Sequence, residues 1–345
     1  MNAAGAGGLT AAEVDALLAP LDASRFALVA VSGGPDSTAL LLMAAEWAAR
    51  RGTTRIVAAT VDHGLRPESA AEARGVAELC ERLGVPHYTL VWTGAKPSTR
   101  LQERAREARY RLLAEKARAI GADIVVTAHH ADDQAETVLF RLMRGSGVAG
   151  LRGMEPMSRR NGVTIARPLL GVGKSALVAF ARARAAAFAD DPSNAELRFA
   201  RPRLRALIAS LASEGLDAEG LARLARRAAE ADEALARMTA EVETRLGGDG
   251  AIDARVLFEA PIAIVQRILA RRVAAAGGRD SSRIGLEKIE ALALRLRDAS
   301  IEKRALKANV GGAVARLNAK GKLEFSPEPA RRTVGRIRSA GAHDE

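Results

Sequence analysis

The stretch from Phe26 to Leu42 constrains the fold more than any other part of this sequence. It runs from the apolar segment FALVAV through the turn SGGPDS into an apolar segment of helical character that opens at Thr38. A strand that feeds a helix through such a turn leaves backbone N–H groups without partners at the start of the helix. These groups, together with the helix dipole, suit a phosphate. Gly33 and Gly34 would allow the backbone to approach that ligand closely.

The side chains of the turn add to this anion site. The hydroxyls of Ser32 and Ser37 are further donors, and Asp36 offers a carboxylate for Mg²⁺. The alternative is an ordinary turn in which Asp36 or Ser37 caps the helix. A Walker A loop is excluded here because the GxxxxGK[ST] spacing is absent from this stretch.

Apolar runs and helical segments alternate along the first two hundred residues. The expected strands cover 26–31, 55–66, 87–92, 123–130 and 163–169, and the expected helices cover 10–21, 37–51, 68–84, 99–120 and 132–144. Thr99 and Gln102 predict a capping box at the start of the long fourth helix. Strands that alternate with helices predict an α/β fold with a doubly wound parallel sheet.

From about Pro202 the chain changes to Ala, Leu, Arg and Glu at helical spacing, and it ends in short strands with glycine turns. We therefore predict three domains. They are an α/β nucleotide-binding domain at 1–205, a mainly helical domain at 206–300, and a small strand-containing segment with a basic tail at 301–345.

The composition limits the partners and the compartment. The chain of 345 residues has 52 Lys and Arg against 41 Asp and Glu, a net charge of +11, which favours a polyanion such as nucleic acid. The single cysteine, Cys80, excludes an internal disulfide and a Cys₄ cluster. No apolar run approaches the ~20 residues of a membrane span, and the start lacks the pattern of a secretion signal. We expect a cytoplasmic protein, and the sequence leaves both a monomer and a homodimer open.

Polar residues follow three of the predicted strands, where a doubly wound sheet binds its ligands. The first group is the SGGPDS turn. The second includes Val61 and Asp62, whose backbone is placed to read a nucleotide base. The third contains His129, Asp133 and Glu136, which share one face if the helix extends back to His129. A capping arrangement and a metal site are the alternatives for this third group.

Two basic features are harder to interpret from the residues alone. Arg109 lies in a charged helical segment, where a solvated surface is the simplest explanation. Six arginines against one glutamate lie between 141 and 167, among them Arg144 and Arg152. The glycine-rich part of this segment, 145–153, predicts a flexible loop that contacts a phosphate backbone.

The SGGPDS turn matches the SGGxDS signature of the PP-loop ATP pyrophosphatases, which adenylate their substrates. With VDHGLR, QERAREARY, TAHHADDQAETVLFRLMRGSGVAGL, RPLL and DDPSN followed by RPRLR, roughly residues 25–205 resemble the tRNA(Ile)-lysidine synthase family. The resemblance implies that domain 1–205 is the adenylating domain. It implies an ATP-dependent ligase that joins lysine to C2 of the wobble cytidine of a CAU-anticodon tRNA(Ile), through an adenylated tRNA, with release of pyrophosphate and AMP.

The resemblance also implies roles for individual residues. Arg109 and His129 would steady the phosphate of the adenylated intermediate, and Asp133 and Glu136 would receive lysine. ATP would be held by Ser32, Gly33, Gly34, Pro35, Asp36, Ser37, Val61 and Asp62, with Asp36 as the Mg²⁺ ligand. Arg203 and Arg205 would contact tRNA or the interdomain junction, and from the basic segment we predict that Arg144 and Arg152 also bind tRNA. The alternatives are a PP-loop tRNA thiolase and a non-catalytic RNA-binding protein with an ATP-binding fold.

Overall fold

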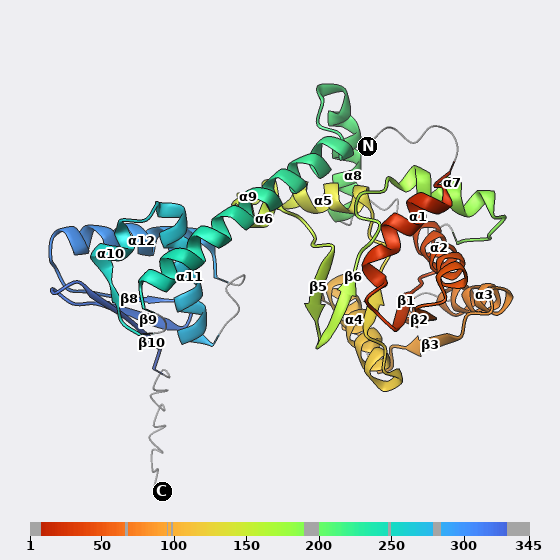
Figure 1. Ribbon diagram of the computed structural model, residues 1–345, viewed down its shortest axis with the longest axis horizontal. Helices are drawn as coiled ribbons and strands as arrows, with labels where there is room; N and C mark the ends of the chain where they lie inside the picture. The colour runs from red at the N-terminus through yellow and green to blue at the C-terminus, as the bar shows by residue number, and fades with distance from the viewer. Residues whose placement is uncertain are drawn as a thin grey trace, which may run out of the picture. The chain divides into compact units, whose positions relative to one another are not determined.

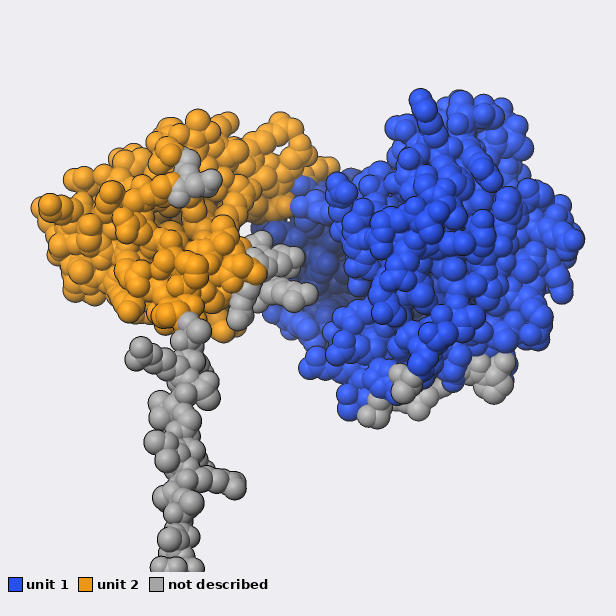
Figure 2. Space-filling view, turned by 90° about the horizontal axis from the view of Figure 1, so that it is seen from below, with its two compact units in different colours: residues 1–229 blue, residues 230–345 orange. Residues whose placement is uncertain are grey.

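The computed structural model describes most of the chain and divides it into two compact units, residues 1–229 and 230–345 (Figures 1 and 2). The described residues are 8–65, 68–94, 96–97, 99–189, 200–247, 250–278 and 284–329. The DDPSN motif at 190–194 and the basic tail from 330 to 345 lie outside them. The predicted domain boundary after residue 205 falls within helix α8 (Ala200–Leu211) of the first unit.

The first unit contains a six-stranded sheet in the order β3-β2-β1-β4-β6-β5. The strands are β1 (Phe26–Ala30), β2 (Arg55–Asp62), β3 (His87–Val91), β4 (Ile124–Val126), β5 (Met157–Arg160) and β6 (Val163–Ala166). All neighbouring pairs are parallel except β5 and β6, which form an antiparallel hairpin. This confirms the predicted α/β class, and it adds the edge strand β5, which we did not predict.

Helices cover both faces of this sheet (Figure 1). In chain order, the helices of this part of the chain are α1 (Ala11–Leu18), extended by a 3₁₀ turn at Ala19–Leu21, α2 (Pro35–Arg51), α3 (Ser69–Arg82), α4 (Leu101–Ile120), α5 (Ala131–Leu142), α6 (Val148–Leu151), α7 (Lys174–Ala183), α8, a 3₁₀ turn at Ala212–Glu214, and α9 (Ala218–Arg245). Helices α8 and α9 pack on α5, and α9 continues past residue 229 into the second unit. Side chains of β1 alternate between the two faces. Ala27 and Val29 pack in the core with α1, α2, α3 and α7, whereas Leu28 packs in the core with α4. This alternation follows from the period of two along a strand.

The order in which strands are added to the sheet reverses between β1 and β4, although these two strands are parallel. The chain passes outward from β1 to β2 and β3, and then returns to add β4 on the other side of β1. Such a switch point opens a crevice at the carboxyl ends of the two strands. The SGGPDS turn leaves β1 there, and the segment that begins at Thr127 leaves β4 there.

One predicted helix start is wrong. Helix α4 begins after Arg100, whose φ of 53° is left-handed, and no side chain caps it, so Thr99 and Gln102 do not form the predicted capping box. A capping side chain must belong to the residue directly before the helix. The helix starts one residue later than that pattern requires, although it ends at Ile120 as predicted.

The second unit combines helices with a four-stranded antiparallel sheet in the order β7-β10-β9-β8. Its elements are β7 (Ile252–Asp253), α10 (Ala254–Phe258), α11 (Ile262–Gly277), α12 (Leu286–Ile301), β8 (Leu306–Val310), β9 (Ala313–Leu317) and β10 (Lys322–Pro327). Strands β8 to β10 and helices α10 to α12 bury their apolar side chains in one shared core. Across the described part of the chain, no helix is both long and apolar enough to span a membrane.

Candidate active site

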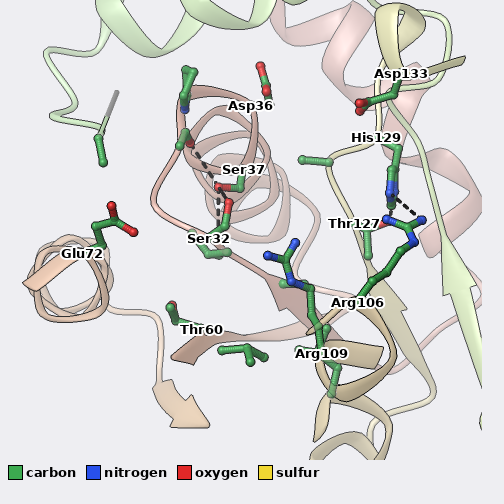
Figure 3. Close-up of a pocket in the computed structure, with 18 of the residues that line it drawn as sticks. Ser32, Asp36, Ser37, Thr60, Glu72, Arg106, Arg109, Thr127, His129 and Asp133 are labelled. Atoms are coloured by element: carbon green, nitrogen blue, oxygen red, sulfur yellow. Dashed lines mark hydrogen bonds between the residues drawn. The ribbon is translucent and has the colours of Figure 1, made fainter. Parts of the chain in front are cut away.

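A cavity of about 330 Å³ lies at the switch point of the first sheet (Figure 3). It is lined by residues from β1, α2, β2, α3, α4, α5, α7 and α8, so segments far apart in the sequence meet around one space. Of the predicted site residues, those on the wall are Ser32, Gly34, Pro35, Asp36, Ser37, Val61, Arg109, His129, Asp133 and Arg205. The lining does not include Gly33, Asp62, Glu136, Arg144, Arg152 or Arg203.

The SGGPDS turn presents the start of α2 to this cavity. Gly34 precedes the helix in extended conformation, and no side chain caps it. Ser37 Oγ instead donates to Gly34 O at 3.1 Å and accepts from Ser32 N at 3.1 Å. The alternative reading, in which Asp36 or Ser37 caps the helix, is therefore wrong, because both residues lie inside the helix. Gly33 has a φ of +88°, a conformation that favours glycine, and this shapes the turn.

Asp36 has one oxygen prepared for a ligand. Its Oδ1 atom is buried and has no hydrogen-bond partner, while its Oδ2 atom lies 3.4 Å from His130 Nε2. A buried carboxylate oxygen without a partner is costly unless something binds it. Mg²⁺ commonly takes one or two protein carboxylates together with phosphate oxygens, so Asp36 beside a bound triphosphate fits this ion. The described residues contain no group of three or more side chains that would hold a metal without such phosphates.

His130 is a buried residue that we did not predict for the site. Its imidazole lies within 3.4–3.5 Å of three carboxylates, those of Asp36, Asp132 and Asp133. Burial alone would lower the pKa of His130, but these carboxylates outweigh it and raise the pKa to about 10. Conversely, His130, with a further contribution from the backbone N–H of Lys174, lowers the pKa of Asp132 to about 2. A cationic His130 therefore links the ATP loop to the start of α5.

His129, the neighbouring histidine, is in the opposite state. Its Nδ1 atom lies 2.9 Å from Thr127 Oγ1, and its Nε2 atom lies 3.5 Å from Arg106 Nη2. Burial lowers the pKa of His129 to about 3, with Arg106 among the cations that add to the effect and Asp133 opposing it. His129 is therefore neutral at any pH at which the protein would work.

Arg109 points into the middle of the cavity, toward Ser32, from the wall formed by α4 (Figure 3). Its side chain is accessible to solvent through the cavity, yet the surrounding protein partly desolvates the guanidinium and lowers its pKa. The group remains charged, because the ordinary pKa of arginine is above 12. The structure therefore places Arg109 at the cavity, whereas Arg104 and Glu107 of the same helix form an exposed ion pair on its solvated face.

Asp133 and Glu136 are held by arginines of α8. Arg201 Nη1 lies 3.2 Å from Asp133 Oδ1, and Arg205 Nε donates to Glu136 Oε1. Glu136 is 2% exposed, and its burial raises its pKa although Arg205 and Arg201 lower it. The capping alternative, Asp133 with Glu136, is wrong because both residues lie inside α5. Asp133 instead forms a capping box with His130, whose backbone N–H it accepts at 3.3 Å. Arg201 was missed because nothing in its local sequence shows that α8 packs against α5.

The end of β2 contributes one wall residue and one supporting residue. Val61 lines the cavity, whereas Asp62 uses its groups within the protein. The Asp62 carboxylate accepts from Ser69 Oγ at 2.5 Å and from Gly64 N at 2.9 Å, and these bonds lower its pKa. The backbone carbonyl of Asp62 accepts from Trp92 N in the loop after β3.

The arginine-rich segment after α5 is folded more tightly than expected for a flexible loop. Residues 145–153 contain helix α6, and Arg141 donates to the carbonyls of Gly150 and Gly153 at 2.7 and 2.8 Å. The Gln134 amide bonds the backbone of Arg152 and Met154. These bonds satisfy backbone groups that a loop would otherwise leave to water.

The sheet with its switch-point cavity and the SGGPDS turn at the start of α2 define an ATP-binding protein of the PP-loop class. In agreement, residues 9–211 match the family described as the PP-loop domain. The chain is 46% identical to the tRNA(Ile)-lysidine synthase of Bradyrhizobium sp. (strain BTAi1 / ATCC BAA-1182), over 95% of this chain and 97% of that protein. It is 48% identical to the enzyme of the same name from Rhodopseudomonas palustris, over 96% and 98%. The chain belongs to the tRNA(Ile)-lysidine synthase family, and it is therefore an ATP-dependent ligase.

A solved structure supports the fold. The U34-tRNA thiolase NcsA from Methanococcus maripaludis, solved with its [4Fe-4S] cluster, superimposes with a TM-score of 0.54 at 16% identity. The match covers 63% of this chain and 76% of that chain. At this identity the likeness concerns the fold alone.

Proposed function

We propose that this cavity ligates lysine to C2 of the wobble cytidine of a CAU-anticodon tRNA(Ile) at the expense of ATP. The observation that carries the proposal is that a single cavity joins the SGGPDS turn to Arg109, His129 and Asp133. A phosphate site, cations on the opposite wall and carboxylates for an amine are what the two steps of this reaction need.

In the first step, the C2 oxygen of cytidine attacks the α-phosphorus of ATP. The bond from that phosphorus to the bridging oxygen breaks, and pyrophosphate leaves with the electron pair. The start of α2 and the hydroxyls of Ser32 and Ser37 hold the phosphates. Arg109 faces these residues across the cavity and stabilises charge on the transferred phosphate. Val61, which lines the cavity, borders the adenine, and Asp62 supports the end of β2 behind it through its bonds to Gly64 and Ser69.

Asp36 would hold Mg²⁺ through the Oδ1 atom that has no protein partner. When bound there, the ion neutralises charge on the phosphates and on the departing pyrophosphate. His130 positions the Asp36 carboxylate through its other oxygen.

In the second step, the lysine ε-amine attacks C2, the C2–O bond breaks, and AMP leaves. Asp133 and Glu136 receive lysine, whose ammonium would take the place of the α8 arginines as their partner. The amine must lose a proton before it attacks. Glu136 is the better acceptor because burial raises its pKa.

The tRNA would bind basic side chains on the cavity wall, where Arg205 lies, and others that do not line the cavity, namely Arg144, Arg152 and Arg203. Arg144 is exposed after α5 and stacks on Phe140, with its guanidinium carbon 4.1 Å from the ring centre. Arg152 borders α6, while Arg203 and Arg205 lie on α8, so phosphates of the tRNA could bind around the cavity entrance. Because ATP and tRNA are the proposed substrates, we infer that the reaction takes place in the cytoplasm.

A thiolase mechanism fits this chain poorly. Cys80 is the only cysteine of the sequence, and it is buried in α3. Burial raises the pKa of its thiol to about 11, so it is not a ready nucleophile.

Nucleoside analysis tests the proposal directly. After incubation of a CAU-anticodon tRNA(Ile) with ATP, Mg²⁺, lysine and the protein, mass spectrometry should find lysidine in the digested tRNA. AMP and pyrophosphate should form only when tRNA is present. Tight binding of tRNA without AMP formation would instead support the non-catalytic RNA-binding alternative.

A further inference from the structure

Both ring nitrogens of His129 form hydrogen bonds within the protein. An arginine guanidinium can only donate, so the Nε2 atom that faces Arg106 must be the acceptor. The ring proton then sits on Nδ1 and is donated to Thr127 Oγ1 at 2.9 Å. The Thr127 hydroxyl in turn donates to the carbonyl of Ala166 at 3.3 Å. Each hydrogen bond from Arg106 through His129 and Thr127 to Ala166 then has one donor and one acceptor. In this arrangement His129 has no N–H left to donate to a phosphate.

The groups around His129 keep it neutral. Arg106 on α4, Arg167 after β6 and Arg201 on α8 all disfavour a second cation, and Asp133 on α5 is the opposing charge. A neutral imidazole without a free N–H cannot donate to a phosphate or offset its charge. Any contribution of His129 to phosphate binding must therefore pass through another side chain.

Arg106 is that side chain. It lines the cavity one helical turn before Arg109, and its Nη2 atom lies near Tyr110 Oη at 3.4 Å as well as His129. Its guanidinium lies over the Tyr110 ring at 5.1 Å. Among the described residues, Nη1 and Nε of Arg106 have no hydrogen-bond partner, and neither Arg106 nor Arg109 forms an ion pair. Figure 3 shows the Arg106 guanidinium beside His129 and the Arg109 guanidinium nearer Ser32.

Arg106 and Arg109 are two cations of one cavity that form no ion pair with a described carboxylate, so an anion would be stabilised beside them. Burial lowers the pKa of Arg106, and Arg201, Arg160 and Arg109 lower it further. A bound phosphate would relieve this repulsion and would accept the N–H groups of Arg106 that have no partner.

We propose that Arg106 binds the phosphate of the adenylated intermediate together with Arg109, and that His129 is a positioning residue that acts only through Arg106. The identity of the phosphate rests on the proposed function. The assignment of an anion site to Arg106 rests on the geometry of the cavity.

A double-mutant cycle tests the proposal. The variants are Arg106→Gln, His129→Leu and the pair, with AMP formation measured as kcat/KM for tRNA. Arg106→Gln should lose about 100-fold, the effect of removing one donor to a developing charge. His129→Leu should lose about 10-fold, and the double variant should be no worse than Arg106→Gln, since residues that act as one unit are not additive. A double variant that loses the product of the two factors would overturn the proposal.

Rescue separates positioning from packing. His129→Gln keeps an acceptor that reaches Arg106 and should stay within about 3-fold of the wild type, whereas His129→Asn is too short and should behave as the leucine variant does. The asparagine variant also replaces the leucine variant in the cycle if the latter fails to fold. Arg104→Gln is the matched control, because Arg104 is on the same helix but pairs with Glu107 at the surface. Equal activity of the glutamine and asparagine variants would contradict the proposed role of His129.

Direct binding of AMP provides a readout that does not depend on turnover. Titration calorimetry should show AMP bound about 10-fold more weakly by Arg106→Gln and by His129→Leu, with no further loss in the pair. Arg104→Gln and His129→Gln should bind as the wild type does. If the wild type forms no AMP from ATP, tRNA and lysine, the proposed function fails, while this pattern of AMP binding still decides the role of Arg106. Unchanged AMP binding by Arg106→Gln would overturn that role.

Discussion

Asp36 and His130 meet at 3.4 Å between Oδ2 and Nε2, although 93 residues separate them in the chain, from 36 to 130. The contact orients one oxygen of Asp36 and leaves the other, Oδ1, buried without a partner. The two residues belong to the starts of α2 and α5, which follow the two strands at the switch point. The geometry at Asp36 is thus a product of the sheet order.

Replacement of Asp36 by Asn should abolish the first step. The amide keeps the size of the side chain but removes the charge that would hold Mg²⁺, so pyrophosphate release should fall at least about 100-fold. Binding of tRNA, measured by filter retention, should stay within about 2-fold, since Asp36 lies inside the cavity. Asp22→Asn is the control, because Asp22 pairs with Arg51 at the surface. Unchanged pyrophosphate release by Asp36→Asn would exclude the proposed role.

The sequence was sufficient to predict the sheet and the phosphate turn. Both follow from local sequence patterns, namely an apolar run, a glycine pair and a helical spacing, which can be recognised without knowing any distant contact. The hairpin strand β5 was missed because MSRR has no apolar alternation, and its pairing with β6 supplies its structure. The capping box at Thr99 was predicted from a valid local pattern, but the local pattern did not determine where α4 begins.

The site was predictable only where its residues carry a motif. Asp36, Arg109, His129 and Asp133 belong to segments that resemble a known family, and the structure brings these four residues to one cavity. Arg106, His130 and Arg201 gain their importance from contacts across the fold. Helical spacing shows which residues share a face, but it does not show that a guanidinium on α8 reaches a carboxylate on α5.

Replacement of Glu136 by Gln should separate the two steps. Glu136 would receive lysine and accept its proton, so KM for lysine should rise at least about 10-fold and kcat for AMP release should fall. Pyrophosphate release in a single turnover should be close to that of the wild type, because adenylation precedes lysine attack. The control is Glu46→Gln, which breaks an ion pair with Arg184 elsewhere in the unit. Equal losses in both steps would assign Glu136 to stability and not to lysine.

Gly33 and Gly52 offer a matched pair for the phosphate turn. They lie before and after α2, with φ of +88° and +66°, so alanine at either position adopts a left-handed conformation that costs roughly 1–2 kcal/mol. A Cβ at Gly33 would also contact Val76 at 3.5 Å, whereas one at Gly52 would meet nothing within 4 Å. Both variants should lose similar stability in urea unfolding, but only Gly33→Ala should raise KM for ATP. A similar rise in both would mean that the turn acts through general stability.

The pH dependence of stability should report the charge on His130. Its pKa is raised from 6.5 to about 10 in the folded state, so its contribution is fully present below about pH 6.5 and is lost as the pH rises through 10. The Cys80 thiol begins to ionise in the unfolded chain near pH 9, so the useful window is pH 6.5 to 9. In buffer with EDTA and without nucleotide, the free energy of unfolding of the wild type should fall by about 1–3 kcal/mol across this window.

His130→Gln should be less stable at pH 6.5 by about 3–5 kcal/mol, because three carboxylates lose their cation, and its stability should change little from pH 6.5 to 9. Parallel curves for the two proteins would show that His130 is neutral between the carboxylates, and the account of Asp36 as a residue oriented by a cation would have to be abandoned.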